Sequence, residues 1–234
     1  MLVARRTDRL ARLAGELGGP EVALAVTADL AKPDGVEALQ RALEARGIDV
    51  DLLVNNAGLG QAGPVHEQPP ERLRAIVDVN VRALVDLTCG LLPAMVERGR
   101  GAIINVVSMS AFQPVPFLAV YAASKAFVLS FTESLATELA GTGVVVQALC
   151  PGNIPTEFQE VAGTADVPFS RTPATTPAEV VAASLRGLER RRLIVIPGLK
   201  DRITVGAQRF VPRSWVRHVA AGLFRAPTGG GGRA

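Results

Sequence analysis

The chain has 234 residues, of which 48% are hydrophobic and 20% are charged, enough apolar material for the core of one α/β domain. Its net charge of +3 arises from 25 basic and 22 acidic residues spread along the chain, and aromatic residues make up only 4%. This composition excludes a disordered chain. It also argues against nucleic acid as a partner, because such a surface needs clustered basic side chains with interleaved aromatics.

Short apolar runs alternate with helical segments from the first residues onward, which predicts a parallel sheet wrapped by helices. We expect strands at residues 2–5, 22–27, 50–54, 102–107, 144–149 and 193–196. We expect helices at residues 8–17, 33–46, 70–98, 120–139 and 177–190, the last opened by a capping box at residues 176–179. Because the strands are continuously apolar, both faces of the sheet should be covered. The predicted fold class is α/β with a doubly wound parallel sheet.

The segment after residue 198 is basic and amphipathic. Trp215, Val219 and Phe224 lie on one helical face, with arginines between them. We therefore divide the chain into a domain at residues 1–198, a basic extension at 199–226 and a disordered tail at 227–234. Packing of the extension on the domain or on a partner subunit is the favoured interpretation, and a weak contact with an anionic membrane surface is the alternative.

Cysteines, histidines and hydropathy indicate a cytoplasmic protein without a metal. No apolar run reaches about 18 residues and we find no secretory signal, so no membrane span is expected. Cys89 and Cys150 lie in apolar segments without paired spacing, which predicts buried, reduced thiols. His66 and His218 show no ligand spacing.

Tyr121 is the only tyrosine, and Lys125 follows it at the spacing that places both on one helical face. Because a nearby ammonium favours the phenolate, we expect the pKa of Tyr121 to be lowered. Ser108 lies at the end of a predicted strand, the edge at which open parallel sheets bind ligands. By chance, a tyrosine in a chain of this composition would have both a lysine and a serine at these offsets in about one case in two thousand. An incidental pair of surface side chains is therefore disfavoured. We expect Tyr121 to exchange a proton while Ser108 binds a carbonyl oxygen.

These residues lie in two blocks, INVVS (104–108) and YAASK (121–125), that resemble the active site of short-chain dehydrogenases/reductases. The segments NNAG (55–58) and DVNV (78–81) resemble further motifs of that family, and the match extends from residue 2 to about 198. The resemblance implies a Rossmann-type fold and an NAD(P)-dependent oxidoreductase that interconverts a carbonyl and an alcohol. The catalytic residues implied are Ser108, Tyr121, Lys125 and Asn80. Asn80 would hold a water in a proton relay through Lys125; a core asparagine that kinks its helix is the alternative.

The resemblance also implies where a cofactor binds. Ala4 takes the place of the acidic residue that binds the ribose of NAD, and Arg5 and Arg6 follow it, which favours NADP over NAD. Two solvated arginines at a helix start are the alternative. The cofactor contacts implied are Arg5, Arg6, Asp29, Asn55, Ala57, Gly58, Tyr121, Lys125, Pro151, Gly152, Ile154 and Thr156.

The glycine-rich turn of the family, which holds the pyrophosphate, has no counterpart in the sequence. About 25–30 residues, one strand, turn and helix, are expected to precede Leu2 in a complete family member. The strand in question is central, so its neighbours would be left unpaired. We favour a natural chain that starts upstream of Met1. A truncated, catalytically inactive relative that acts as a binding or scaffolding subunit is the alternative.

The expected border of the substrate pocket is mostly apolar: Phe112, Val115, Pro116, Phe117 and residues 158–175. This favours a hydrophobic ketone, aldehyde or acyl chain over a sugar. The family resemblance further implies a homodimer or homotetramer built on the helices that begin near Pro70 and Val120.

Overall fold

The computed structural model describes residues 1–225, and all of its strand pairings are parallel. The strands are β1 (Leu2–Ala4), β2 (Ala25–Thr27), β3 (Leu52–Asn55), β4 (Gly101–Val106), β5 (Val144–Leu149) and β6 (Ile194–Val195). Four of them form one sheet in the order β3-β4-β5-β6, and β1 pairs separately with β2. The predicted α/β fold with a parallel sheet is confirmed.

Nine α-helices connect and cover these strands in the described part of the chain. They are α1 (Thr7–Glu16), α2 (Pro33–Glu44), α3 (Pro70–Val77), α4 (Ala83–Glu97), α5 (Ala119–Glu138), α6 (Glu157–Ala162), α7 (Pro177–Glu189), α8 (Leu199–Ala207) and α9 (Arg213–Phe224). The helix predicted at 70–98 is α3 and α4, joined by a π-helical turn at Asp78–Arg82. The capping box before α7 is present. Helices α6 and α8 were not predicted, and β2 begins three residues later than expected.

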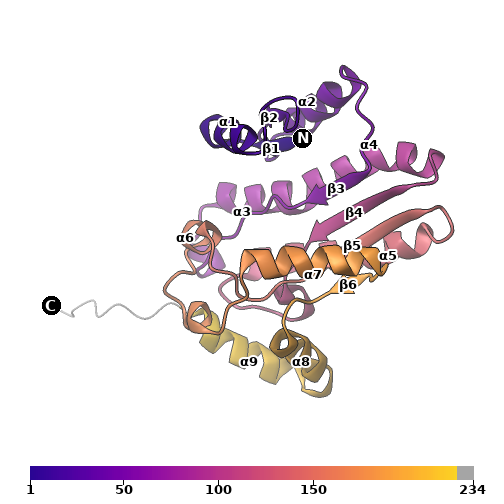
Figure 1. Ribbon diagram of the computed structural model, residues 1–234. Helices are drawn as coiled ribbons and strands as arrows, with labels where there is room; N and C mark the ends of the chain where they lie inside the picture. Colours follow the sequence, from indigo (N-terminus) through magenta and orange to yellow (C-terminus); the bar gives the residue numbers. More distant parts are fainter. Residues whose placement is uncertain (226–234) are drawn as a thin grey trace.

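Helices lie on both faces of the central strands (Figure 1), and alternate residues of these strands pack against opposite layers. Ile103 of β4 is fully buried in a cluster with residues of α4 and α5, whereas its neighbour Ile104 packs with Val180 of α7. The period of two along a strand therefore assigns successive side chains to opposite layers. Both layers stop at the carboxyl ends of the strands, where the connecting loops gather.

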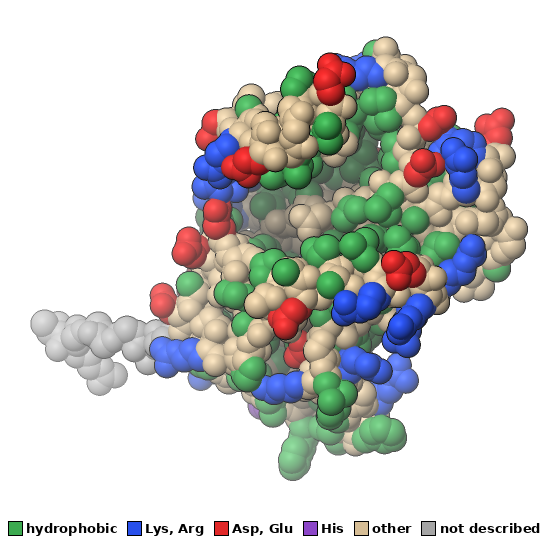
Figure 2. Space-filling view, viewed as in Figure 1, with side chains coloured by type: hydrophobic (Ala, Val, Ile, Leu, Met, Phe, Trp, Pro, Cys, Tyr) green, Lys and Arg blue, Asp and Glu red, His purple; other side chains and the backbone are tan. Residues whose placement is uncertain are grey.

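The N-terminal unit, which we define as β1, α1, β2 and α2, is joined to the rest by helix packing. Val36 and Leu39 of α2 pack against Leu87 of α4. No hydrogen-bonded pairing joins β1 to β3, and Leu52 and Val54 of β3 are 42% and 49% exposed. Figure 2 shows a hollow lined with hydrophobic side chains between this unit and the sheet. The expectation that both sheet faces are covered is thus wrong for β3, which pairs with β4 on one side but has no strand paired to its outer edge among residues 1–225.

Two further expectations have a structural outcome. Cys150 is buried, but Cys89 is exposed on α4, so the prediction of two buried thiols is wrong for Cys89. Among residues 1–225, the helices are too short or too polar to cross a membrane. The tail predicted to be disordered at 227–234 lies outside the described residues.

Candidate active site

A cavity of about 1070 Å³ opens at the carboxyl ends of the central strands and extends from α1 to α9. Ser108, Tyr121 and Lys125 all line it. Ser108 follows β4, where its Oγ accepts a hydrogen bond from Ser110 N at 3.2 Å and opens a 3₁₀ turn. Tyr121 lies in the first turn of α5 and Lys125 in the next. The structure therefore brings together the three residues that the spacing had singled out.

Tyr121 has its phenol enclosed by the protein on one side and open to the cavity on the other. Burial raises its pKa above the ordinary value, and the hydroxyls of Ser108 and Ser110 oppose this with smaller effects. The predicted lowering of the Tyr121 pKa is therefore wrong for this structure. The physical reason is that desolvation of the phenolate outweighs the two hydrogen-bonding hydroxyls, while the ammonium of Lys125 is turned elsewhere.

Lys125 is buried, and its Nζ donates a hydrogen bond to the carbonyl oxygen of Val106 at 2.7 Å. The same atom lies 5.8 Å from the centre of the Tyr121 ring. Burial lowers the pKa of Lys125 to about 8. The side chain is thus held by the end of β4, with an ammonium that can lose its proton near neutral pH.

Asn80 lies in the π-helical turn between α3 and α4, and it anchors the loop after β3. Its Nδ2 donates to Leu59 O and to Ser124 Oγ, both at 2.9 Å, and its Oδ1 accepts from Leu59 N at 2.8 Å. A Cβ added at Gly58 would lie 3.5 Å from Lys125 Nζ and 3.6 Å from Asn80 Oδ1. Asn80 and Lys125 therefore both lie next to Gly58, and Asn80 uses its side chain to hold the backbone of Leu59. A role of Asn80 in proton relay stays a prediction.

A chain of buried hydrogen bonds joins the ends of β3 and β4 to α4 and α5. Asn55 Nδ2 donates to Asn105 Oδ1 at 2.9 Å and to Thr88 Oγ1 at 3.3 Å. Asn105 Nδ2 in turn donates to Thr132 Oγ1 at 2.9 Å. These bonds join β3, β4, α4 and α5. Asn105 and Thr132 were missed by the sequence reasoning, although an asparagine inside an apolar strand is a signal that a polar partner is needed.

Of the predicted cofactor contacts, most line the cavity. They are Arg6, Gly58, Tyr121, Lys125, Pro151, Gly152, Ile154 and Thr156. Arg5, Asp29, Asn55 and Ala57 are not among the lining residues. Asn55 is turned into the buried hydrogen bonds, and its neighbour Asn56 lines the cavity instead. Asp29 Oδ1 accepts from Ala31 N at 3.1 Å, so this carboxylate holds the turn before α2.

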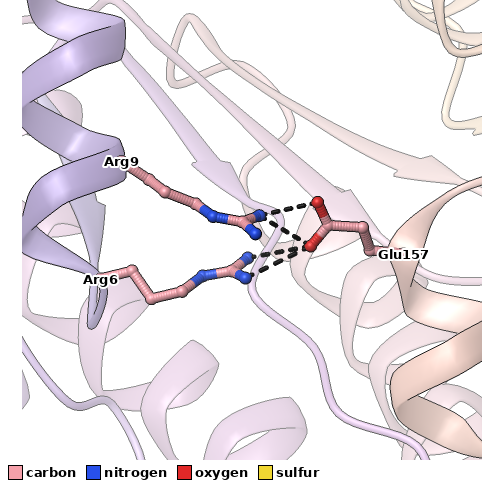
Figure 3. A network of polar contacts seen from close by, with 3 residues as sticks. All are labelled: Arg6, Arg9 and Glu157. Atoms are coloured by element: carbon pink, nitrogen blue, oxygen red, sulfur yellow. Dashed lines mark hydrogen bonds and ion pairs between the residues drawn. The ribbon is translucent and has the colours of Figure 1, made fainter.

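Two arginines converge on one carboxylate at the N-terminal end of the cavity (Figure 3). Arg9 Nη1 lies 2.7 Å from both carboxylate oxygens of Glu157, and Arg6 Nη1 lies 3.3 Å from Oε2. Together they lower the pKa of Glu157, with Arg9 as the larger cause. Arg9 was not predicted, but its spacing of three from Arg6 along a helix indicates a shared face. The pair forms an anion-binding group that bridges α1 and α6.

The opposite end of the cavity is mostly apolar, although Lys200, Asp201 and Thr204 of α8 also line it. Its walls include Ile203 of α8 and Trp215, Val219 and Leu223 of α9. The ring of Phe158 lies 5.5 Å from that of Tyr121. From the predicted substrate border the cavity takes Val115, Phe158, Gln159, Thr164, Phe169, Thr172 and Pro173. Phe112, Pro116 and Phe117 do not line it, and the contribution of α8 and α9 was missed.

Known proteins resemble this chain in sequence and in fold. Residues 1–166 match the short chain dehydrogenase family. A short chain dehydrogenase of Pseudocercospora fijiensis is 42% identical over 161 residues, which is 67% of this chain and 52% of that protein. The NADP-dependent 3-hydroxy acid dehydrogenase YdfG of Salmonella typhi is 38% identical over 186 residues, covering 76% of this chain and 74% of that enzyme. The chain thus spans about half the length of the first relative and three quarters of the second.

A solved structure gives the same result. The short-chain dehydrogenase from Sphingobium yanoikuyae in complex with NADPH superposes with a TM-score of 0.76 at 34% sequence identity. The superposition covers 89% of this chain and 83% of that one. The family match and the solved structure agree, and the chain belongs to the short-chain dehydrogenase family.

Proposed function

We propose that this protein is an NADP(H)-linked oxidoreductase that interconverts an apolar carbonyl compound and its alcohol. The observation that carries the proposal is the meeting of Ser108, Tyr121 and Lys125 in one cavity at the carboxyl edge of a parallel sheet. Ligands bind at this edge in open α/β sheets. The Salmonella relative is NADP-dependent and the Sphingobium structure contains NADPH, which supports the same cofactor here.

The chemistry of the donors fits a phosphorylated dinucleotide. The carboxylate of Glu157 already shows that Arg6 and Arg9 can bind one anion between them. Guanidinium groups bind phosphate in the same forked geometry, so these two residues would hold the 2′-phosphate that distinguishes NADP from NAD. Ile154 and Thr156 also line the cavity and would contact the nicotinamide end. When bound, NADPH supplies the hydride for reduction of the carbonyl carbon.

The residues of the chain then supply the proton and orient the substrate. Ser108 Oγ would donate a hydrogen bond to the carbonyl oxygen, and Tyr121 would give its phenolic proton to the same oxygen in reduction or accept it in oxidation. Because burial raises the pKa of Tyr121, the phenol is held protonated in the reducing direction. Lys125, with a pKa of about 8, would return a proton toward Tyr121. Asn80 keeps the neighbouring loop in place through Leu59.

The substrate class follows from the walls of the cavity beyond Tyr121. Phe158, Phe169, Trp215 and Leu223 offer mostly apolar surface there. A hydrophobic ketone, aldehyde or acyl chain would be desolvated favourably at this end, whereas the hydroxyls of a sugar would lose hydrogen bonds to water.

Titration with the two nucleotides tests the cofactor assignment without relying on turnover. Trp215 is the only tryptophan and lines the cavity, so its fluorescence should respond to bound NADPH. We expect NADPH to bind at least about tenfold more tightly than NADH, since charged hydrogen bonds to one phosphate are worth that much. The double variant Arg6→Gln/Arg9→Gln should bind both equally. Failure of the wild type to bind either nucleotide would favour a binding or scaffolding subunit.

A further inference from the structure

The C-terminal helices carry a net positive charge, whereas the rest of the described domain carries a small net negative charge. Residues 199–225, which form α8, the turn Gln208–Phe210 and α9, contain six basic side chains and one acidic side chain. Residues 1–198 contain 18 basic and 21 acidic side chains. The positive net charge of the molecule therefore comes from this end, whereas the domain itself is slightly negative.

The same helices expose large apolar side chains. Phe210 is 89% exposed, Leu199 71%, Trp215 69%, Val219 64% and Ile203 62%. The expectation that Phe224 shares one face of α9 with Trp215 and Val219 is wrong. Phe224 lies on the opposite side and holds the helix to the protein, because it is buried and stacks on Phe169 with ring centres 4.8 Å apart. Figure 2 shows hydrophobic side chains projecting at this lower end of the molecule, with lysine and arginine side chains beside them.

The cavity opens on this surface. Ile203, Trp215 and Val219 are more than half exposed and also line the cavity of the active site. Tyr121, whose ring lies against Phe158, lines the same cavity. A molecule that covers α8 and α9 would therefore cover the entrance for an apolar ligand.

We propose that the α8–α9 surface, defined by Leu199, Ile203, Phe210, Trp215 and Val219 with the surrounding basic side chains, docks on an anionic membrane surface. Exposed tryptophan and phenylalanine among arginines is the composition that favours the interface between lipid headgroups and acyl chains. A second copy of the chain fits less well, because a two-fold contact would place this net positive surface against itself. Resting on the proposed function, a carbonyl compound dissolved in the membrane would then enter the cavity directly.

Vesicle binding tests the docking without cofactor or substrate, so its result is independent of the proposed function. The full chain would be mixed with vesicles of phosphatidylcholine containing phosphatidylglycerol, and with vesicles of phosphatidylcholine alone. We expect sedimentation with the anionic vesicles only, together with a blue shift of Trp215 emission and its quenching by brominated lipid. Absence of sedimentation and of the blue shift would overturn the proposal.

Two variants with a matched control separate the apolar and the charged contributions. Phe210→Ser, which retains Trp215 as a probe, should weaken vesicle binding about thirtyfold through loss of one buried aromatic ring. Arg209→Gln/Arg213→Gln/Arg217→Gln should weaken it about a hundredfold. Arg12→Gln/Arg41→Gln/Arg46→Gln removes as many charges from the N-terminal unit and the turn after it, at the opposite end in Figure 1, and should change binding less than about threefold. An equal loss in this control would contradict the proposal.

The competing occupants give different results. A contrary outcome is that the wild type fails to sediment with anionic vesicles while light scattering shows that Phe210→Ser converts a dimer into a monomer. In that case the surface is an interface between copies of the chain, and the proposal fails. Wild-type thermal midpoints in all variants would show that the exposed substitutions leave the fold intact.

Discussion

The carboxyl edge of the central sheet and the N-terminal unit are held in different ways. At the edge, short side chains such as Asn55, Asn105 and Thr132 are buried and joined by hydrogen bonds of 2.9 Å. The N-terminal unit reaches the far side of the cavity through the long side chains of Arg6 and Arg9, which bind Glu157 in water. Short buried groups have few other conformations, whereas long exposed ones can change partner at small cost. The carboxyl edge can therefore hold reacting atoms in place. In the N-terminal unit, Arg6 and Arg9 can exchange the carboxylate of Glu157 for a phosphate.

At the carboxyl edge of the sheet, which we call the fixed edge, removal of the Tyr121 hydroxyl should have the largest effect. Tyr121→Phe keeps the ring packed against Phe158 but has no proton to transfer, so kcat should fall about a thousandfold. NADPH affinity should stay close to that of the wild type, because the arginine pair is untouched. Steady-state kinetics and nucleotide titration measure the two quantities. Full turnover by this variant would show that Tyr121 is not the proton donor.

The second-largest effect is expected on folding stability, when a buried hydrogen-bonding side chain is removed. Asn105→Ala would remove one buried hydrogen-bond partner from Asn55 and one from Thr132, and should lower the free energy of unfolding by about 2–4 kcal/mol. Denaturant unfolding measures this value. Thr137→Ala, on the exposed end of α5, loses only a hydrogen bond to its own helix and serves as the control. A loss below that of the control would mean that water replaces the missing amide.

Much of the fixed edge could be predicted from the sequence, because its determinants are local. The strand end at Ser108 and the helical spacing of Tyr121 and Lys125 place three side chains together once a parallel sheet is assumed. The direction of the Tyr121 pKa could not be predicted in this way. It depends on how fully the phenol is enclosed and on where Lys125 Nζ points, and the ammonium binds the Val106 carbonyl.

The remaining walls of the cavity depend on contacts between distant segments. Glu157 binds Arg6 and Arg9, which lie 151 and 148 residues before it, and no spacing in the sequence indicates that pairing. The amphipathic pattern of α9 was visible in the sequence, but it has apolar side chains on both the packed and the exposed side. Which of them lines the cavity is decided by the stacking of Phe224 on Phe169.

Lys125 links stability to pH at the fixed edge. Burial lowers its pKa from 10.5 to about 8. Between pH 8 and pH 10.5, Lys125 is therefore protonated in the unfolded chain but largely deprotonated in the folded chain. Stability should therefore rise with pH from about 8 to 10.5, and below pH 8 the buried charge costs up to about 3 kcal/mol. Lys125→Met should remove this rise while abolishing activity. The exposed Lys32→Met is the control, and an equal pH slope in both variants would contradict the assignment.

The smallest effect is expected where the two regions meet, at Glu157. Glu157→Gln should leave the thermal midpoint unchanged, because all three partners are largely exposed to water. It should nevertheless tighten NADPH binding about two- to fivefold at low salt, since the phosphate no longer competes with a carboxylate for Arg6 and Arg9. Arg9→Gln should weaken binding instead. Both differences should shrink as salt is raised, because exposed charges are screened.

Glu160→Gln, on the same helix but without an arginine partner among residues 1–225, should have neither effect. Identical titration curves for Glu157→Gln and wild type would place the phosphate away from this arginine pair.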